Sequence, residues 1–263
     1  MTKRRTLPTR ALGAEPGLPD LPVLAAWVAE HRGEPGDLTS FRIDQSLAPQ
    51  LSAGITMPCF GGKFYRDRVM ACLMNIKDDR VIDEISVSTG SVIEDAVHGV
   101  AQNKGVWCAL PAPHLLGITD AYYHDDDEWR GAISGAYRTI MRSMRDAGVG
   151  GHVLICHHAD DAELSALARR KVFFFQPGAD REDLVTLMEY QQLIAVSSSH
   201  LDMLFDSASE YDLSRIIVLD ADEESITRAL AHLDPDQVAV GGYCTGTCEQ
   251  YWVSVADAAW YTV

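Results

Sequence analysis

The chain has 263 residues, of which 47% are hydrophobic and 23% are charged, a composition typical of a soluble globular protein. No apolar run approaches the roughly 20 residues that a membrane-spanning helix needs, so the sequence predicts no membrane insertion. The 22 Lys and Arg residues are outnumbered by 38 Asp and Glu residues. A net charge of −16 repels phosphate backbones and argues against a nucleic-acid partner.

The first 50 residues are predicted to be a flexible N-terminal arm plus one helix that packs on the following domain. The opening stretch MTKRRTLPTRALGAEPGLPDLP is basic but lacks the apolar core of a secretion signal, which favours a cytoplasmic protein. Residues 22–32 have helical apolar spacing and end before Gly33, and a polar linker is expected after them. Residues 51–263 are predicted to be one catalytic domain.

This second region alternates short apolar runs with longer segments of helical spacing, as repeated βα units do. The predicted strands are residues 54–57, 84–87, 106–110, 152–156, 172–175, 193–196, 216–219 and 237–240. The predicted helices are residues 64–75, 92–102, 128–146, 161–169, 181–190, 200–208, 222–231 and a last one from Cys248, although that last segment is also rich in strand-forming residues. Eight units predict an α/β fold of the (β/α)₈ TIM-barrel type. If the first or last unit fails, an open doubly wound parallel sheet is the alternative. No G-x-G-x-x-G follows a strand, so no nucleotide cofactor is evident.

Three cysteines are candidate metal ligands. Cys59 follows the first predicted strand, and Cys244 and Cys248 follow the last one. A closed barrel places its last strand beside its first, so these thiols are expected to converge and to hold zinc or an iron–sulfur cluster. Thr247 and Gln250 have capping-box spacing, which places Cys248 in a first helical turn where thiolate is favoured. The alternative is that the three cysteines are small buried residues; a disulfide is disfavoured. Cys72, Cys108 and Cys156 are interpreted as core residues.

Candidate acid/base residues come directly after other strands. His157 and His158 follow the fourth predicted strand, His200 the sixth and Asp220 the seventh. Imidazole titrates near neutral pH and suits proton transfer. Neighbouring residues of an extended segment point in opposite directions, so one histidine of the pair is expected to face the barrel mouth. No predicted strand ends on a lysine, which argues against Schiff-base chemistry.

Substrate-binding residues are predicted in the remaining post-strand segments: Ser88, Thr89, Ser91, His114, Gln176, Ser198, Gly241 and Gly242. STGS at residues 88–91 opens a predicted helix, and VGGYCTG at 240–246 supplies glycines, so both favour backbone binding of an anion. The acidic run YYHDDDEW at 122–129 offers hard metal ligands but is interpreted as a helix cap.

The leading hypothesis is therefore an enzyme that acts on a small carboxylated or phosphorylated molecule at the C-terminal rim of a barrel. A Cys-ligated zinc or iron–sulfur centre and a histidine acid/base would make it a lyase, hydrolase or group transferase. A metal-free enzyme with a nucleophilic or redox cysteine and a backbone phosphate site is the first alternative. The second is a non-catalytic binding or scaffold protein whose aromatic tail contacts a partner or a second copy in a homo-oligomer.

Overall fold

Two four-stranded parallel sheets form the centre of the molecule, with the strand orders β10-β11-β12-β2 and β3-β6-β8-β9. The computed structural model describes residues 4–32, 36–208, 210–211 and 213–262. The central strands are β2 (Thr9–Glu15), β3 (Cys59–Gly61), β6 (Trp107–Pro111), β8 (His152–Ile155), β9 (Val172–Phe175), β10 (Leu193–Ser197), β11 (Arg215–Leu219) and β12 (Val238–Thr245).

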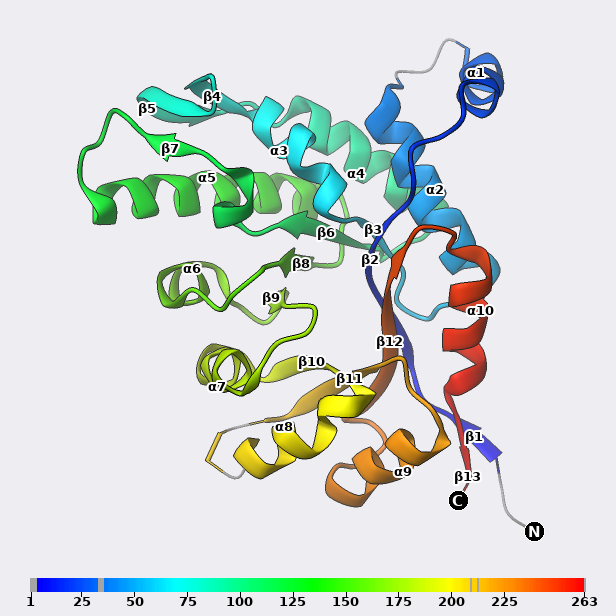
Figure 1. Ribbon diagram of the computed structural model, residues 1–263. Helices are drawn as coiled ribbons and strands as arrows, with labels where there is room; N and C mark the ends of the chain where they lie inside the picture. The colour runs from blue at the N-terminus through cyan, green and yellow to red at the C-terminus, as the bar shows by residue number, and fades with distance from the viewer. Residues whose placement is uncertain (1–3, 33–35, 209, 212, 263) are drawn as a thin grey trace.

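Placed side by side, the two sheets give their eight strands the order of an eight-stranded barrel (Figure 1). On one side they are joined by a parallel bridge between Arg10 and Met57, where Ala11 N donates to Met57 O over 3.0 Å. On the other side β9 and β10 are neighbours, but within the described chain they form no hydrogen-bonded ladder. The predicted TIM-type arrangement is thus present as parallel sheets in barrel order, without the expected closure.

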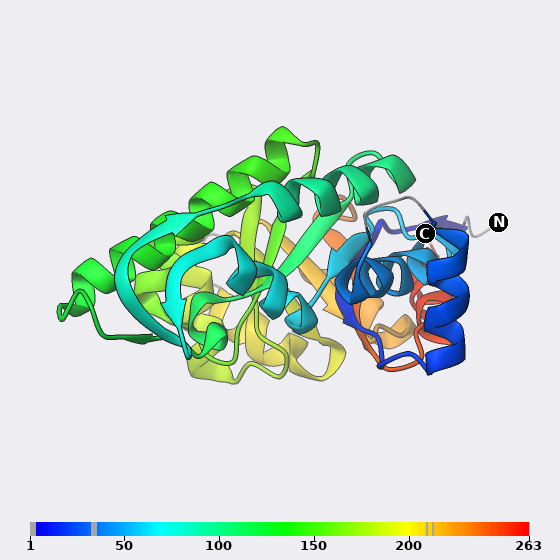
Figure 2. The ribbon, with the colours of Figure 1, turned by 90° about the horizontal axis from the view of Figure 1, so that it is seen from above.

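Helices lie outside the strands, as the view from above shows (Figure 2). They are α1 (Leu21–Glu30), α2 (Leu38–Ser52), α3 (Arg66–Cys72), α4 (Gly90–Gln102), α5 (Asp126–Asp146), α6 (Asp161–Leu167), α7 (Arg181–Tyr190), α8 (Leu201–Ala208), α9 (Glu223–His232) and α10 (Glu249–Ala258), with 3₁₀ turns η1 (Lys63–Tyr65), η2 (Pro113–Leu116) and η3 (Ser198–His200). Several helices begin at an aspartate whose carboxylate accepts a first-turn N–H. Asp125 does this for α5, which confirms that the acidic run caps a helix.

The barrel interior is a packed core. The Arg10 guanidinium of β2 lies 4.1 Å from the ring centroid of Trp107 and 4.8 Å from that of Phe173. These residues come from strands that are not all neighbours in the sheets, so their side chains meet across the interior. Phe175 and Tyr243 contact each other nearer the carboxyl ends, with ring centroids 5.7 Å apart. The filled interior leaves the loops after the strands as the place for chemistry.

Two of the eight predicted strands were assigned wrongly. Residues 84–87 belong to β5 (Arg80–Val87), which forms an antiparallel hairpin with β4 (Leu73–Lys77) and also pairs with β7 (Thr119–Asp120) outside the barrel. Its place in the barrel is taken by β2, which lies in the predicted flexible arm and is almost entirely buried. Residues 54–57 precede the strand instead of forming it, since β3 begins at Cys59.

The predicted helix at 22–32 is confirmed as α1, although none of its residues is buried. The predicted linker after it contains α2, which buries Phe41, Ile43 and Leu47. The last segment has both expected conformations, because α10 is followed by β13 (Trp260–Thr262). β13 pairs antiparallel with β1 (Arg4–Thr6), which brings the two ends of the described chain together (Figure 1). No helix among the described residues is long and apolar enough to span a bilayer.

Candidate active site

A lysine and a histidine meet beyond the ends of β3 and β8, the two strands that flank β6. Lys63 comes two residues after β3, and its Nζ lies 3.2 Å from Nε2 of His157, two residues after β8. An ammonium group has only donors, so Nε2 of His157 is the acceptor. Partial removal from water and then the positive charge of Lys63 lower the pKa of His157 below its ordinary value. The neutral form of this imidazole is therefore favoured at the surface of the barrel mouth.

His114 continues this chain of hydrogen bonds toward a buried carboxylate. Its Nε2 accepts a hydrogen bond from the backbone N–H of His157 over 3.3 Å. Its Nδ1 therefore carries the proton and donates to Glu163 Oε2 over 2.9 Å. Glu163 Oε1 also accepts from the His114 N–H, and only 7% of Glu163 is exposed. The His158 ring packs on His114 with a centroid separation of 4.3 Å. This arrangement fixes one tautomer of His114 and orients it.

A cavity of about 310 Å³ adjoins the His114–Glu163 pair. It lies between η2, α5 and α6, and its other lining residues include Trp129, Arg130 and Asp160. The Arg130 Nη1 atom is 3.1 Å from both carboxylate oxygens of Asp160, so that charge is already paired. The volume is at the lower end of the range typical of small-molecule sites. A small polar ligand in this cavity would contact His114 and Glu163 directly.

Glu15, the last residue of β2, is hydrogen-bonded to the segment that carries Lys63. Its Oε1 accepts hydrogen bonds from the Lys63 backbone N–H and the Tyr243 hydroxyl, and Arg42 Nη2 lies 3.9 Å from its Oε2. Burial and then the Glu15 charge raise the pKa of Tyr243, so this phenol stays a donor. Arg42 also donates to Pro16 O over 3.1 Å. Glu15 thus fixes the backbone that carries Lys63.

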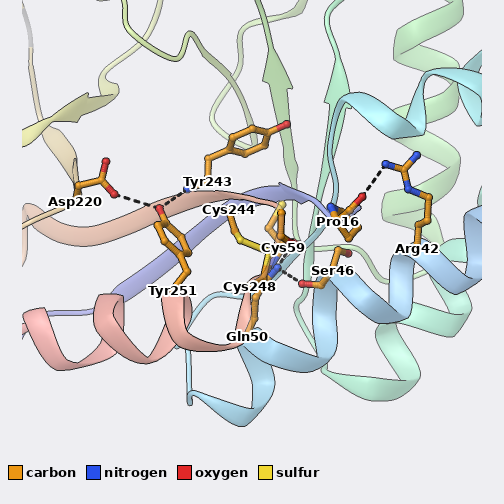
Figure 3. The surroundings of a disulfide bond; sticks show 11 residues. Pro16, Arg42, Ser46, Gln50, Cys59, Asp220, Tyr243, Cys244, Cys248 and Tyr251 are labelled. Atoms are coloured by element: carbon orange, nitrogen blue, oxygen red, sulfur yellow. Dashed lines mark hydrogen bonds between the residues drawn. A yellow bond between two sulfur atoms is a disulfide. The ribbon is translucent and has the colours of Figure 1, made fainter. Parts of the chain in front are cut away.

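The predicted three-cysteine metal centre is not assembled. Cys244 and Cys248 form a disulfide, so neither thiol is free to bind a metal in this state (Figure 3). The strand order places β2 between β12 and β3, so the expectation that Cys59 and Cys244 lie on adjacent strands is wrong, although Cys59 is among the residues around the disulfide (Figure 3). Burial raises the pKa of Cys59, which keeps it a thiol. Among the described residues, no group of three or more His, Cys, Asp or Glu side chains has the geometry of a metal site.

The two halves of the disulfide frame the start of α10. Cys244 belongs to β12, and Cys248 is the N-cap residue of α10 without a capping bond from its side chain. The capping box predicted from Thr247 and Gln250 is therefore wrong, because the helix begins one residue later than that spacing required. As expected, Cys72, Cys108 and Cys156 are buried free thiols.

The structure distributes the other predicted site residues over both sheets. His114, His157 and His158 lie together, whereas His200 and Asp220 follow β10 and β11. The His200 Nδ1 is 2.9 Å from Ser197 Oγ, and Ser198 lies with it in η3. Asp220 Oδ1 accepts from the Tyr251 hydroxyl over 3.4 Å.

The remaining predicted ligand-binding residues have local structural contacts. Gln176 is buried at the end of β9 and donates to Asp183. Ser88, Thr89 and Ser91 stand at the start of α4, after the hairpin strand β5, so they do not follow a barrel strand. Thr89 is the N-cap residue of α4 but makes no side-chain capping bond.

Gly241 and Gly242 are strand residues, not the expected phosphate-binding loop. β12 continues to Thr245, five residues beyond the predicted strand end. A Cβ atom at Gly241 would collide with Ile217 and with the Arg10 carbonyl, and one at Gly242 would collide with the Tyr251 ring. These glycines allow close packing of β12 against its neighbours and α10.

Sequence reasoning missed Glu15, Lys63, Arg42, Tyr243 and Glu163. β3 ends at Gly61 and not on a lysine, but Lys63 follows after one glycine and reaches the barrel mouth. Had the strand been placed over CFG at residues 59–61, the lysine would have been found in the same way as the histidines were. Glu15 is not identified as a site residue from the sequence, because its strand is predicted to be part of a flexible arm.

No family model matches this chain, and no curated protein matches it in sequence. Among solved structures, it is similar to the "Putative Vitamin-B12 Independent Methionine Synthase" from Listeria monocytogenes, with a TM-score of 0.64 and 15% identity over 96% of this chain and 98% of that one. Weaker similarities are to a homocysteine methyltransferase from Escherichia coli (TM-score 0.47, 13% identity, 97% and 96% covered) and to the tryptophan synthase alpha subunit from Legionella pneumophila (TM-score 0.42, 10% identity, 97% and 93% covered).

The match to the Listeria protein covers nearly the whole of both chains, and it shows a TIM-barrel-like α/β fold for this chain. At this level of identity the similarity concerns the fold alone. Function must be argued from the residues at the barrel mouth.

Proposed function

We propose that this protein is an enzyme that transfers a group to or from a small, negatively charged molecule at the carboxyl end of its barrel. The observation that carries the proposal is the chain of hydrogen bonds Lys63–His157–His114–Glu163, which joins the loops after three strands. Such a chain pairs an anion-binding ammonium with a neutral, oriented base, beside a cavity of about 310 Å³.

In this mechanism the Lys63 ammonium binds a carboxylate or phosphate of the substrate. That contact replaces its hydrogen bond to His157 and frees Nε2. The neutral imidazole then removes a proton from the attacking hydroxyl, amine or thiol as the group is transferred, and returns the proton to the leaving group. His114 and Glu163 act as positioning residues, because they hold the backbone N–H of His157 in place.

This proposal places no role on a cysteine-bound zinc or iron–sulfur centre, since two of the three predicted ligands are joined as a disulfide. Unlike the metal-free alternative, it also assigns no nucleophilic or redox role to Cys244 or Cys248, because both sulfur atoms are in the disulfide. The Lys63 ammonium supports a substrate with a carboxylate or phosphate, and the name of the Listeria neighbour makes methionine a sensible component of the first mixtures to be tested.

A turnover screen tests the proposal. The purified protein is incubated with a defined mixture of amino acids including methionine, dicarboxylates, sugar phosphates and inorganic phosphate, and the mixture is followed by NMR. We expect the wild type to consume a component, His157→Gln to lose at least about a hundredfold in rate, and Lys63→Met to weaken substrate binding, as removal of an acid/base group typically does. The matched variants His124→Gln and Lys104→Met change exposed side chains elsewhere and should retain the wild-type rate.

Histidine resonances provide a readout that a purely structural role would not move. Because the positive charge of Lys63 lowers the pKa of His157, the Lys63→Met variant should raise that pKa. No consumption by the wild type, or equal consumption by His157→Gln, would contradict the proposed function.

A further inference from the structure

A second and larger cavity, of about 700 Å³, lies away from the histidine chain. It is bounded by α2, by the segment that leads from β2 into α1, and by the turn between β12 and α10. The turn is the one closed by the Cys244–Cys248 disulfide, so part of the wall is covalently fixed (Figure 3).

Aromatic and aliphatic side chains form part of the wall of this cavity. Trp27 and Phe41 provide aromatic surface, with their ring centroids 5.5 Å apart and their planes nearly perpendicular. Leu18, Ala48 and Pro49 extend the apolar lining. A body of aromatic or aliphatic carbon would find apolar contacts over much of this surface.

The charged residues of the wall are all acidic. Asp44 and Glu249 line the cavity, and no Lys, Arg or His is among its lining residues in the described part of the chain. Asp44 accepts from Trp27 Nε1 over 3.0 Å, so this carboxylate lies beside the aromatic surface. Glu249 is exposed in the first turn of α10. Asp44 Oδ1 also lies 2.5 Å from His98 Nε2, which is outside the wall, so the charge available to a ligand is that of the exposed Glu249. An exposed carboxylate and the face of an aromatic ring both attract a positive charge.

We propose that this cavity binds an organic cation, namely a primary amine carried on an apolar or aromatic body. The ammonium group lies beside the Glu249 carboxylate, and the body lies against Trp27 and Phe41. The site is separate from the proposed active site but adjoins it along the chain, because Pro16 of its wall follows Glu15 and accepts a hydrogen bond from Arg42. The inference does not depend on the proposed function.

Three probes of the same shape test the charge requirement by isothermal titration calorimetry: phenethylamine, 2-phenylethanol and 3-phenylpropionate. We expect saturable one-site binding of the amine, binding of the alcohol weaker by about fivefold, and no binding of the carboxylate, since partly exposed charge pairs contribute little more than this. Equal binding of the amine and the alcohol, or absence of saturable amine binding, would overturn the proposal.

Variants test the location. Ala48 is exposed on α2 and lines the cavity, so Ala48→Trp fills it without removing a core contact and should abolish amine binding. Ser52→Trp serves the same purpose if the first variant folds poorly. Glu249→Gln should weaken the amine and leave the alcohol unchanged, whereas Glu182→Gln, an equivalent first-turn change on α7, should affect neither. Amine binding retained by both tryptophan variants would place the ligand elsewhere and refute the assignment.

Discussion

His152, the first residue of β8, is fully buried, and neither of its ring nitrogens has a hydrogen-bond partner in the described structure. Burial, and then the charge of Arg145, lower its pKa to about 3. The unfolded chain binds a proton at this side chain near pH 6.5, whereas the native protein does not. Native stability from this residue is therefore present above pH 6.5 and is lost as the pH falls toward 3.

We predict that His152→Leu makes the protein less sensitive to acid. Between pH 7 and pH 5 the wild type should lose about 2 kcal/mol of unfolding free energy through this one histidine, because each pH unit between the two pKa values corresponds to about 1.4 kcal/mol. Urea unfolding at both pH values measures the difference, with His124→Gln as the exposed control. The same loss in His152→Leu as in the wild type would show that His152 is not the titrating group.

At the residue scale, the sequence allowed good prediction where a polar side chain directly follows a well-defined apolar strand. His114, His157 and His158 were found this way, and the structure places them together. Lys63 and Tyr243 were missed because the ends of β3 and β12 were placed several residues too early. The disulfide was disfavoured on general grounds of cysteine usage, and the pairing of Cys244 with Cys248 depends on a turn geometry that the sequence spacing alone does not specify.

The element most different from its prediction is β2. Its sequence, TRALGAE, has polar residues at both ends and a glycine inside, so it lacks the continuous apolar run that marks the other strands. Its parallel pairing with β12 identifies this segment as a barrel strand, which sequence periodicity does not. The converse error was β5, whose alternating residues do form a strand, but in a hairpin outside the barrel. The count of eight units was therefore reached through two compensating errors.

A truncation distinguishes a barrel strand from an arm. Deletion of residues 1–15 removes β2, with the buried residues Ala11, Leu12 and Ala14, and leaves an unpaired edge on β12. We expect this variant to lose its cooperative thermal transition, because it loses the buried Leu7 and Leu12, worth about 2 kcal/mol each, together with the β2–β12 ladder and the Arg10 side chain that fills the interior. Circular dichroism measures the transition.

Deletion of residues 1–6 is the matched control. It removes β1, which is exposed and pairs only with β13 among the described strands, so its barrel should remain folded. A cooperative transition of normal size after deletion of residues 1–15 would show that β2 is dispensable, as a flexible arm would be.

For the whole molecule, 38 acidic against 22 basic residues give a net charge of −16. Repulsion among like charges destabilises a compact state, and salt screens it over about 10 Å at 0.1 M. We predict that raising the sodium chloride concentration from about 0.02 M to about 0.5 M increases the thermal midpoint by roughly 2–4 °C. This is the shift expected for a stabilisation of about 1 kcal/mol in a chain of this size. Differential scanning fluorimetry at fixed pH measures it. A fall in the midpoint would show that favourable ion pairs outweigh the repulsion.

The pairing of β2 with β12 also has a consequence in time. Arg10 pairs with Gly241, so the first barrel strand completes its sheet only with one of the last segments of the chain. During synthesis, which proceeds from the N-terminus, β2 has no partner on this side until nearly the whole protein has left the ribosome. The loop that closes this contact spans most of the chain, and the entropy of closing it must be overcome late. The order of events therefore favours assembly of the sheet β3-β6-β8-β9 before the sheet that contains the first strand.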